Sequence, residues 1–181
     1  MGILNVTPDS FSDGGAYRSV EEAVARGLEM EAEGAAILDV GGESTRPGSF
    51  PVPADEEMRR VIPVIRGLAA KTNAVISVDT TKAAVANAAV AAGARIVNDT
   101  SALADDPEMA AAVRASGAAV VLMHRRGSPA TMQETPHYDA LFDELLAELT
   151  GRIAAAEGAG IDRERILVDP GIGFGKRLCD N

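Results

Sequence analysis

Residues 74–99, AVISVDTTKAAVANAAVAAGARIVND, contain one complete copy of the pattern that decides the fold. The stretch begins with an apolar run at Ala74–Val78, passes through a helix-like segment at Lys82–Ala92, and ends in a second apolar run at Ala94–Val97. Gly93 stands between the helix and the second run, where a helix C-cap favours a left-handed backbone. Short, continuously apolar runs are typical of parallel strands with both faces covered. The stretch therefore predicts two parallel strands joined by a helix.

The same alternation continues outward to both ends of the chain. Each apolar run ends in a polar or glycine-rich loop, and a stretch rich in Ala, Glu and Arg with helical spacing follows. Strict alternation of strands and helices indicates a parallel α/β fold. The further strands are predicted at Gly2–Val6, Ala36–Val40, Ala118–Met123 and Arg165–Val168, and the further helices at Val20–Glu33, Ala54–Lys71, Pro107–Ser116 and Asp139–Glu157, with Gly34, Gly117 and Gly158 as C-caps.

Two parallel architectures have this alternation, an open doubly wound sheet and a (β/α)8 barrel. The open sheet usually carries a glycine-rich phosphate turn after its first strand. Here the first strand runs into the segment Asn5–Gly15, and polar residues follow almost every strand, which is typical of the TIM barrel. A complete barrel has about 250 residues. We therefore expect this α/β chain of 181 residues to form an incomplete (β/α)8 TIM barrel of about six βα units, as a single domain over residues 1–181 that is truncated at its C-terminus.

Composition narrows the class of protein. One cysteine, Cys179, excludes an intramolecular disulfide, and together with an N-terminus that does not resemble a signal peptide it indicates a cytoplasmic location. A net charge of −10 argues against a nucleic acid partner, because phosphate backbones are held by basic surface. No apolar stretch approaches the ~20 residues of a membrane span, so we expect no membrane partner. A small-molecule substrate, including an anionic one, remains compatible with this composition.

Polar side chains gather where the predicted strands end. In a barrel these ends meet at one mouth, where active sites are found. A single Asp or Asn at such a point is as often a helix cap as a functional group. Recurrence on successive strands favours one common site. The residues at the strand ends are Asn5, Asp39, Asp79, Asn98 with Asp99, Met123 with His124, and Asp169.

The residue types at this mouth suit a flat heterocycle rich in N–H donors. A carboxylate offers only acceptors and an amide offers both donors and acceptors, so a guanidine-like ligand edge could pair with a carboxylate. A glycosidase also places two carboxylates at a barrel mouth, but the absence of Trp and an aromatic content of 3% leave little surface for stacking on sugars. Asn5 is a candidate ligand for Mg²⁺, which takes oxygen ligands. Two histidines and one cysteine provide no zinc ligand set.

The glycine-rich segment Gly171–Lys176 invites comparison with a P-loop. A P-loop needs four residues between its first glycine and Gly-Lys, followed by Ser or Thr. Here only three residues separate Gly171 from Gly175, and Arg177 follows Lys176. The segment is therefore interpreted as a tight glycine turn after the sixth strand, which leaves the roles of Phe174 and Lys176 open.

Six motifs of the chain, in order, resemble those of the dihydropteroate synthase family. The first two are long and specific, the later ones are weak alone, and the match spans the whole chain. The motifs are Gly2–Gly15, Asp39–Gly48, Ser77–Thr80, Val97–Thr100, Val121–His124 and Asp169–Lys176.

The resemblance implies a pterin-binding barrel that condenses a dihydropterin-methyl diphosphate with 4-aminobenzoate and releases diphosphate in folate biosynthesis, as a target of sulfonamides. It implies Mg²⁺ as cofactor, with Asn5 as the metal-linked residue, and a homodimer for the full-length protein. The segments Thr7–Gly15 and Gly42–Gly48 resemble a pair of loops that closes over the site. The catalytic residues implied are Asp79, Asn98, Asp169 and Arg46, and the substrate-binding residues implied are Thr45, Arg46, Pro47, Asp79, Asn98, Met123, Asp169 and Phe174.

Departures from the family pattern concern the C-terminal end. The family's lysine near the seventh strand, and its arginine and histidine near the eighth, would follow Asn181. The family usually has His-Asn where this chain has Asp180 and Asn181. Two other functions stay open: a pterin-carrying barrel of a corrinoid methyltransferase, which lacks the loops after the first two strands, and an inactive truncated fragment. We also expect an unclosed barrel to be poorly stable, because its edge strands are unpaired.

Overall fold

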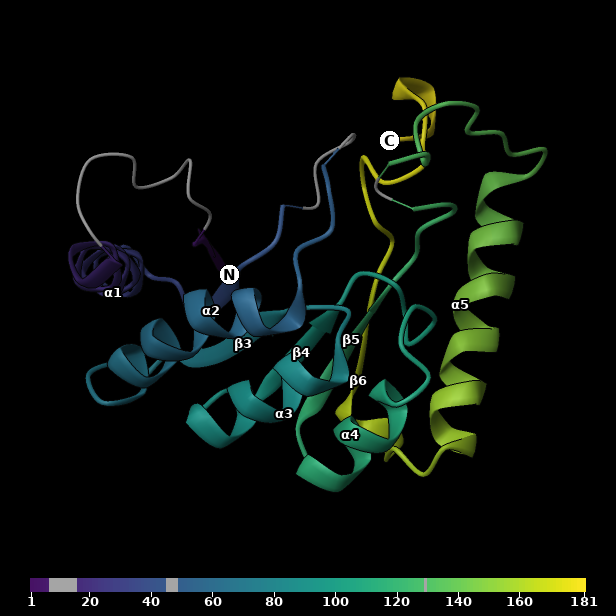
Figure 1. The fold of residues 1–181 in the computed structure, drawn as a ribbon. Helices are drawn as coiled ribbons and strands as arrows, with labels where there is room; N and C mark the ends of the chain where they lie inside the picture. Colours follow the sequence, from purple (N-terminus) through teal and green to yellow (C-terminus); the bar gives the residue numbers. More distant parts are fainter. Residues whose placement is uncertain (7–15, 45–48, 129) are drawn as a thin grey trace.

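The computed structural model describes residues 1–6, 16–44, 49–128 and 130–181, and of residues 16–19 it describes the backbone only. Over these residues six strands alternate with five α-helices (Figure 1). The strands are β1 (Gly2–Asn5), β2 (Ile37–Gly41), β3 (Val75–Asp79), β4 (Ile96–Asp99), β5 (Ala119–Met123) and β6 (Ile166–Asp169); the helices are α1 (Ala16–Ala32), α2 (Ala54–Ala69), α3 (Ala83–Ala92), α4 (Met109–Ser116) and α5 (Leu141–Gly158). Short 3₁₀ turns lie at Arg163–Arg165 and Leu178–Asp180.

All five strand pairings are parallel, and the strands stand side by side in chain order, β1-β2-β3-β4-β5-β6. Each predicted strand and helix is present, with ends that differ by a few residues. In Figure 1, α2, α3 and α4 lie along one face of the sheet, while α1 and α5 lie at its two sides. This arrangement confirms the predicted α/β class and corresponds to six successive strands of a (β/α)8 barrel.

The strands divide their side chains between two faces, because successive residues of a strand point in opposite directions. One face meets the helices and forms the main core, to which Leu38, Val40, Val78 and Leu122 contribute fully buried side chains. The helices match it with apolar stripes, such as Val61, Val64, Ile65 and Leu68 of α2. Burial of this kind stabilises by about 25 cal/mol per Å² of apolar surface.

The opposite face of the sheet is the one that a barrel encloses. Its middle strands are covered, with Ile96 only 7% and Val121 only 8% exposed. Its outer strands are not, since Ile3 of β1 is 64% and Leu167 of β6 is 43% exposed. Over the described residues this face is therefore covered in the middle of the sheet and open at the two edge strands.

Three helix ends follow the prediction and one does not. Gly34, Gly93 and Gly117 have the positive φ angles expected of C-caps, at 105°, 125° and 69°. Gly158 is instead the last residue of α5, and the positive φ falls on Gly160, at 88°. Gly158 and Gly160 are only two residues apart, and the sequence alone does not show which of them takes the positive φ. The position of the helix end depends on how the chain enters β6.

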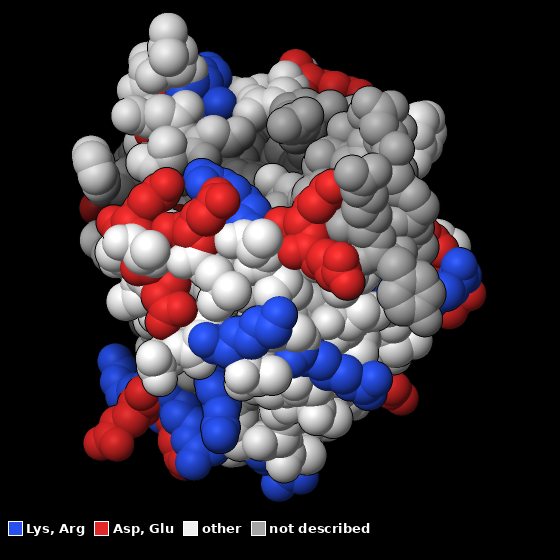
Figure 2. Space-filling view, turned by 90° about the vertical axis from the view of Figure 1, so that its left-hand side faces the viewer, with Lys and Arg blue, Asp and Glu red and all other residues white. Residues whose placement is uncertain are grey.

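Charged side chains are mixed over the surface. On the face shown in Figure 2, Asp and Glu gather mainly in the upper half, and most Lys and Arg lie below them. No helix in the described part of the chain is long and apolar enough to cross a membrane.

Candidate active site

A row of four residues crosses the C-terminal end of the sheet. Asn5 is paired in register with Gly41, Gly41 with Asp79, and Asp79 with Asn98. Gly41 has no side chain to separate its neighbours: a Cβ there would lie 3.4 Å from Asp79 Oδ2 and 3.7 Å from Asn5 Oδ1. The row therefore brings an amide and a carboxyl to the same space above Gly41, as the strand-end pattern predicted.

Asp79 is the one carboxyl of this four-residue row, and its surroundings perturb it strongly. It is half-buried and accepts no hydrogen bond from the described residues. Burial, together with the negative charges of Asp39 and Glu57, raises the pKa of Asp79 well above its ordinary value. A carboxyl without a donor in such surroundings is a strong candidate for a ligand contact.

Asn98 is oriented by a residue below it. Asp39 lies in the middle of β2, not at its end as predicted, and its Oδ2 accepts a 2.9 Å hydrogen bond from Asn98 Nδ2. This bond uses one of the two N–H donors of the amide and leaves the other N–H and Asn98 Oδ1 available to a ligand. Two buried atoms beside it, Asp39 Oδ1 and Ser77 Oγ, have no hydrogen-bond partner among the described residues. Burial also raises the pKa of Asp39, against the lowering effects of the neighbouring Ser77 hydroxyl and Asn98 amide.

The last strand brings a second carboxyl. Asp169 ends β6 opposite Met123 of β5, and its Oδ1 accepts a 2.7 Å hydrogen bond from Gly171 N. Met123 is buried and lies next to the turn that follows β6. A Cβ at Gly171 of this turn would lie 3.3 Å from Met123 Cγ. Phe174 of the same turn is half-buried. Asp169 and Met123 thus lie on the β5–β6 side of the mouth, and Phe174 belongs to the turn that follows.

Two strand-end residues prove to have other roles. Asp99 is fully buried on the helix side of β4, where its carboxylate accepts hydrogen bonds from Ser101 N and Oγ and from Leu103 N. It thereby holds a turn in which Ala102 and Leu103 have positive φ angles of 52° and 65°. His124 is buried beneath the β6 turn. The expectation that both side chains converge on the mouth was wrong, because neighbouring residues of a strand face opposite ways.

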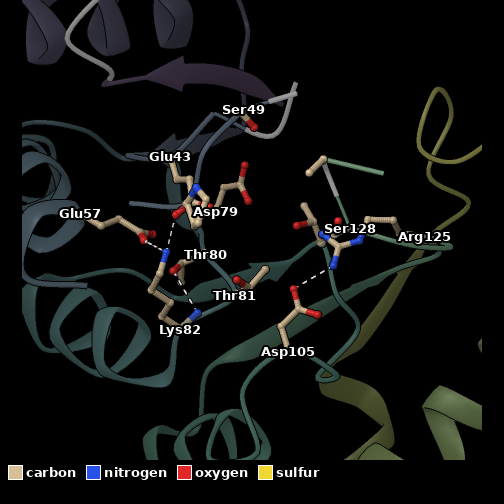
Figure 3. A pocket seen from close by; sticks show the side chains of 13 residues that line it. Glu43, Ser49, Glu57, Asp79, Thr80, Thr81, Lys82, Asp105, Arg125 and Ser128 are labelled. Carbon is tan, nitrogen blue, oxygen red and sulfur yellow. Dashed lines mark hydrogen bonds and ion pairs between the residues drawn. The ribbon is translucent and has the colours of Figure 1, made fainter. Parts of the chain in front are cut away.

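The β2–β3 side of the mouth contains a charged group that sequence reasoning missed. Lys82 Nζ lies 2.5 Å from Glu43 Oε2 and 2.5 Å from Glu57 Oε2 (Figure 3). Glu57 is fully buried in α2, and its Oε1 has no partner among the described residues. Glu43 also accepts from Val52 N at 3.0 Å, which ties together the two ends of the segment 43–52.

This group borders a cavity of about 340 Å³ that opens beside Asp79 (Figure 3). Across the cavity, Arg125 pairs with Asp105 at 2.8 Å and is itself only 5% exposed. No spacing in the sequence links these residues, which come from different loops. The only available signal was their place just after predicted strands.

A magnesium ion fits this mouth in part. Mg²⁺ takes oxygen ligands and usually shares them with substrate phosphates. Asn5 Oδ1 and Asp79 Oδ2 face the space left free by Gly41. No group of three His, Cys, Asp or Glu side chains within the described ranges could hold a metal by itself. Thr45, Arg46 and Pro47, predicted to border the substrates, lie outside the described residues, as do residues 7–15 of the first predicted loop.

A parallel α/β sheet with polar groups converging at its C-terminal mouth defines the class of (β/α)8-barrel enzymes. Within that class, the family model of the pterin binding enzymes matches residues 1–181, and the chain belongs to this family. Dihydropteroate synthase of Escherichia coli (strain K12) is 49% identical over the whole chain, which spans 64% of that protein.

Solved structures agree in fold with the chain. Xanthomonas albilineans dihydropteroate synthase with 4-aminobenzoic acid is 55% identical with a TM-score of 0.92, covering 100% of this chain and 64% of its own. The Yersinia pestis dihydropteroate synthase in a sulfonamide drug complex is 44% identical with a TM-score of 0.93, covering 100% of this chain and 66% of its own. The chain therefore spans about two thirds of the length of these similar proteins.

Proposed function

We propose that the protein is a dihydropteroate synthase, which joins (7,8-dihydropterin-6-yl)methyl diphosphate to 4-aminobenzoate and releases diphosphate. The observation that carries the proposal is the geometry of Asp79 and Asn98: a carboxyl that accepts no hydrogen bond from the described residues stands in register beside an amide that Asp39 orients. Family membership and the relatives' activity support the same conclusion.

The mouth suits the pterin ring chemically. Asp79 and Asp169 would accept N–H groups of the guanidine-like edge, and a charge-assisted pair of this kind is about twice as strong as a neutral one. Asn98 Oδ1 would accept a further N–H group, while the bond from its Nδ2 to Asp39 fixes the plane of the amide. Met123 and Phe174 would line the flat faces of the ring.

Asp79 has an additional consequence for binding. Its raised pKa reflects burial and nearby acids that disfavour the charged form. A ligand edge with N–H donors would favour the ionised form again. The ligand therefore satisfies a group that the protein leaves without a donor.

The chemistry requires stabilisation of a leaving diphosphate more than a strong base. The pterin ring delocalises the positive charge that develops at its methylene carbon, and the arylamine of 4-aminobenzoate is a good nucleophile when neutral. Mg²⁺ bound at Asn5 and the substrate phosphates would supply charge neutralisation. Arg46 would add a fork of N–H donors to the departing diphosphate, and Thr45 and Pro47 would border the aminobenzoate. Closure of segments 7–15 and 42–48 would exclude water.

Other expectations remain part of this proposal. They are a homodimer of the full-length protein, a cytoplasmic location, inhibition by sulfonamides, and residues 1–181 as one domain. The folate-carrier alternative binds a pterin but transfers nothing to 4-aminobenzoate, and turnover therefore distinguishes the two.

The test uses the protein expressed from its full reading frame. We expect diphosphate release that requires both substrates. Asp79→Asn should weaken binding of a dihydropterin analogue about 10- to 100-fold by calorimetry, the value of one charge-assisted contact. Asp143→Asn, on the exposed surface of α5, is the matched control. Pterin binding without turnover would favour the carrier, and unchanged affinity of Asp79→Asn would remove this residue from the site.

A further inference from the structure

Lys176 is a buried cation without a carboxylate partner. It is only 4% exposed, and no ion pair joins it to any described residue. Its ammonium nitrogen lies 3.0 Å from Gly171 O, 3.2 Å from Phe174 O and 3.0 Å from His124 Nδ1, with His124 O at 3.4 Å. A buried charge is costly unless hydrogen-bonded, and here all three N–H donors have an acceptor.

The acceptors belong to the turn that follows β6. Gly171, Gly173 and Gly175 have positive φ angles of 66°, 81° and 61°. The turn thereby curls so that the carbonyls of Gly171 and Phe174 face one point, which the ammonium occupies. Gly171 N also donates to Asp169 Oδ1, so the turn is joined directly to a candidate pterin ligand. The ammonium acts in the turn as a bound metal ion would.

The loop after β5 holds the outside of the same turn. Tyr138 Oη donates to Gly175 O at 2.9 Å, and Gln133 Nε2 donates to Gly173 O at 2.5 Å. Arg126 lies over the ring of Tyr138 with its guanidinium carbon 4.3 Å from the ring centroid. The carbonyls of residues 171, 173, 174 and 175 are thus all fixed from neighbouring groups.

His124 completes the arrangement in a defined state. Its Nδ1 faces the ammonium and must accept, so its Nε2–H donates to Glu148 Oε2 at 3.0 Å. Burial and the positive charge of Lys176 lower the pKa of His124, and Glu148 opposes the shift. Arg126 in turn binds Glu148 and Glu144.

We propose that Lys176 is a positioning residue, a built-in cation that sets the 171–175 turn and thereby places the Asp169 carboxylate and the Phe174 ring for the ligand. The inference rests on the proposed function for the identity of that ligand. Lys176 does not bind phosphate itself, because its donors are used and its nitrogen is enclosed. This resolves the role that the sequence pattern left open.

The test is chemical rescue of Lys176→Ala, in the protein expressed from its full reading frame. Removal of the side chain leaves a hole lined by carbonyl oxygens, which methylammonium can fill. We expect an affinity for a dihydropterin analogue about 10-fold weaker than that of the wild type. Methylammonium should restore part of it. Tetramethylammonium at equal ionic strength should not, because it has no N–H donor.

Amide hydrogen exchange provides a second readout that needs no ligand. The amides of Gly171 and Phe174 should exchange faster in Lys176→Ala and slow again with methylammonium, while amides of β3 stay protected. Lys176→Gln, which keeps a donor without the charge, should be intermediate and serves if the alanine variant does not fold. Unchanged exchange at the turn overturns the inference about Lys176. If methylammonium slows the exchange of these amides as expected but the protein binds no pterin, only the proposed function is overturned.

Discussion

Lysines on two sides of the mouth hold their loops in opposite ways. On the β2–β3 side, Lys82 lies between Glu43 and Glu57, and hydrogen bonding to these carboxylates raises its pKa against the effect of burial. On the β5–β6 side, Lys176 is held by carbonyl oxygens and an imidazole, and burial lowers its pKa. One side is organised by charge, and the other by backbone shape.

The difference determines what each side does to its neighbours. The acids around Lys82 extend to Asp79, because Glu57 and Glu43 are among the charges that raise the pKa of Asp79. Lys176 instead fixes positions, since its ammonium group donates to carbonyl oxygens of the turn that carries Phe174. We infer that charge tunes one pterin carboxylate and geometry places the other.

The sharpest way to break the β5–β6 side is to change its backbone. A Cβ at Gly171 would lie 2.1 Å from His124 O, at a φ of +66°. Gly171→Ala should therefore lose about 4 kcal/mol or more of the free energy of unfolding. Gly173→Ala is the matched control, because φ is also positive at +81° but nothing lies within 4 Å, so about 1 kcal/mol is expected. Urea unfolding measures both losses. Equal losses would contradict the close approach of the turn to His124 O.

The β2–β3 side should lose stability when the positive charge of Lys82 is removed. Lys82→Met leaves Glu57 buried and unpaired, and should lose about 3 kcal/mol of unfolding free energy. The double variant Lys82→Met/Glu57→Gln should regain part of this loss. Arg59→Met, which breaks the surface pairs of Arg59 with Asp55 and Glu56, is the control and should change stability by less than about 1 kcal/mol. If the losses of unfolding free energy of the two single variants simply add in the double variant, the two charges do not interact.

Arg46 tests whether the loop anchored by Glu43 serves catalysis. Arg46→Ala should leave the melting temperature nearly unchanged and lower turnover by at least about 10-fold, or about 1.4 kcal/mol in the transition state. Arg46→Lys should recover only part, because a point charge cannot reproduce the fork of donors. Steady-state kinetics at saturating substrates decide this, and wild-type turnover in Arg46→Ala would make it an ordinary surface arginine.

The smallest expected effect is a pH dependence on the β5–β6 side. His124 has a folded pKa below its ordinary 6.5 because of burial and Lys176, with Arg126 acting in the same direction and Glu148 opposing. The unfolded chain therefore takes up its proton first, and stability falls as pH drops from about 6.5 through the folded pKa. His124→Asn should lose this part of the slope in urea unfolding at several pH values, whereas His137→Asn, an exposed position, should keep it.

Secondary structure and the row of site residues were predictable because both depend on local pattern. Apolar runs identified each of the six described strands, and the residues that end them gave Asn5, Asp79, Asn98 and Asp169. The error over Asp99 was avoidable, since strand alternation forbids Asn98 and Asp99 to face the same way.

Other features depend on contacts that the sequence does not mark. Lys82 and Glu57 are 25 residues apart, and Lys176 and His124 are 52 apart. Nothing in their spacing indicates that two such lysines are held differently. Thr45, Arg46 and Pro47 remain predictions, because they lie outside the described residues.

The order of strands also bears on how the protein is made. Every described strand after β1 pairs with the strand synthesised just before it, so each new strand–helix unit finds its partner already in place. Each pairing still has to wait for the crossover helix between the two strands, and parallel sheets are slow to form for this reason. The hydrogen bond from Asn98 to Asp39, 59 residues apart, can form as soon as β4 docks. The residues of the row Asn5, Gly41, Asp79 and Asn98 are thus all present once β4 has been synthesised, whereas the Lys176 turn can be added only after β6.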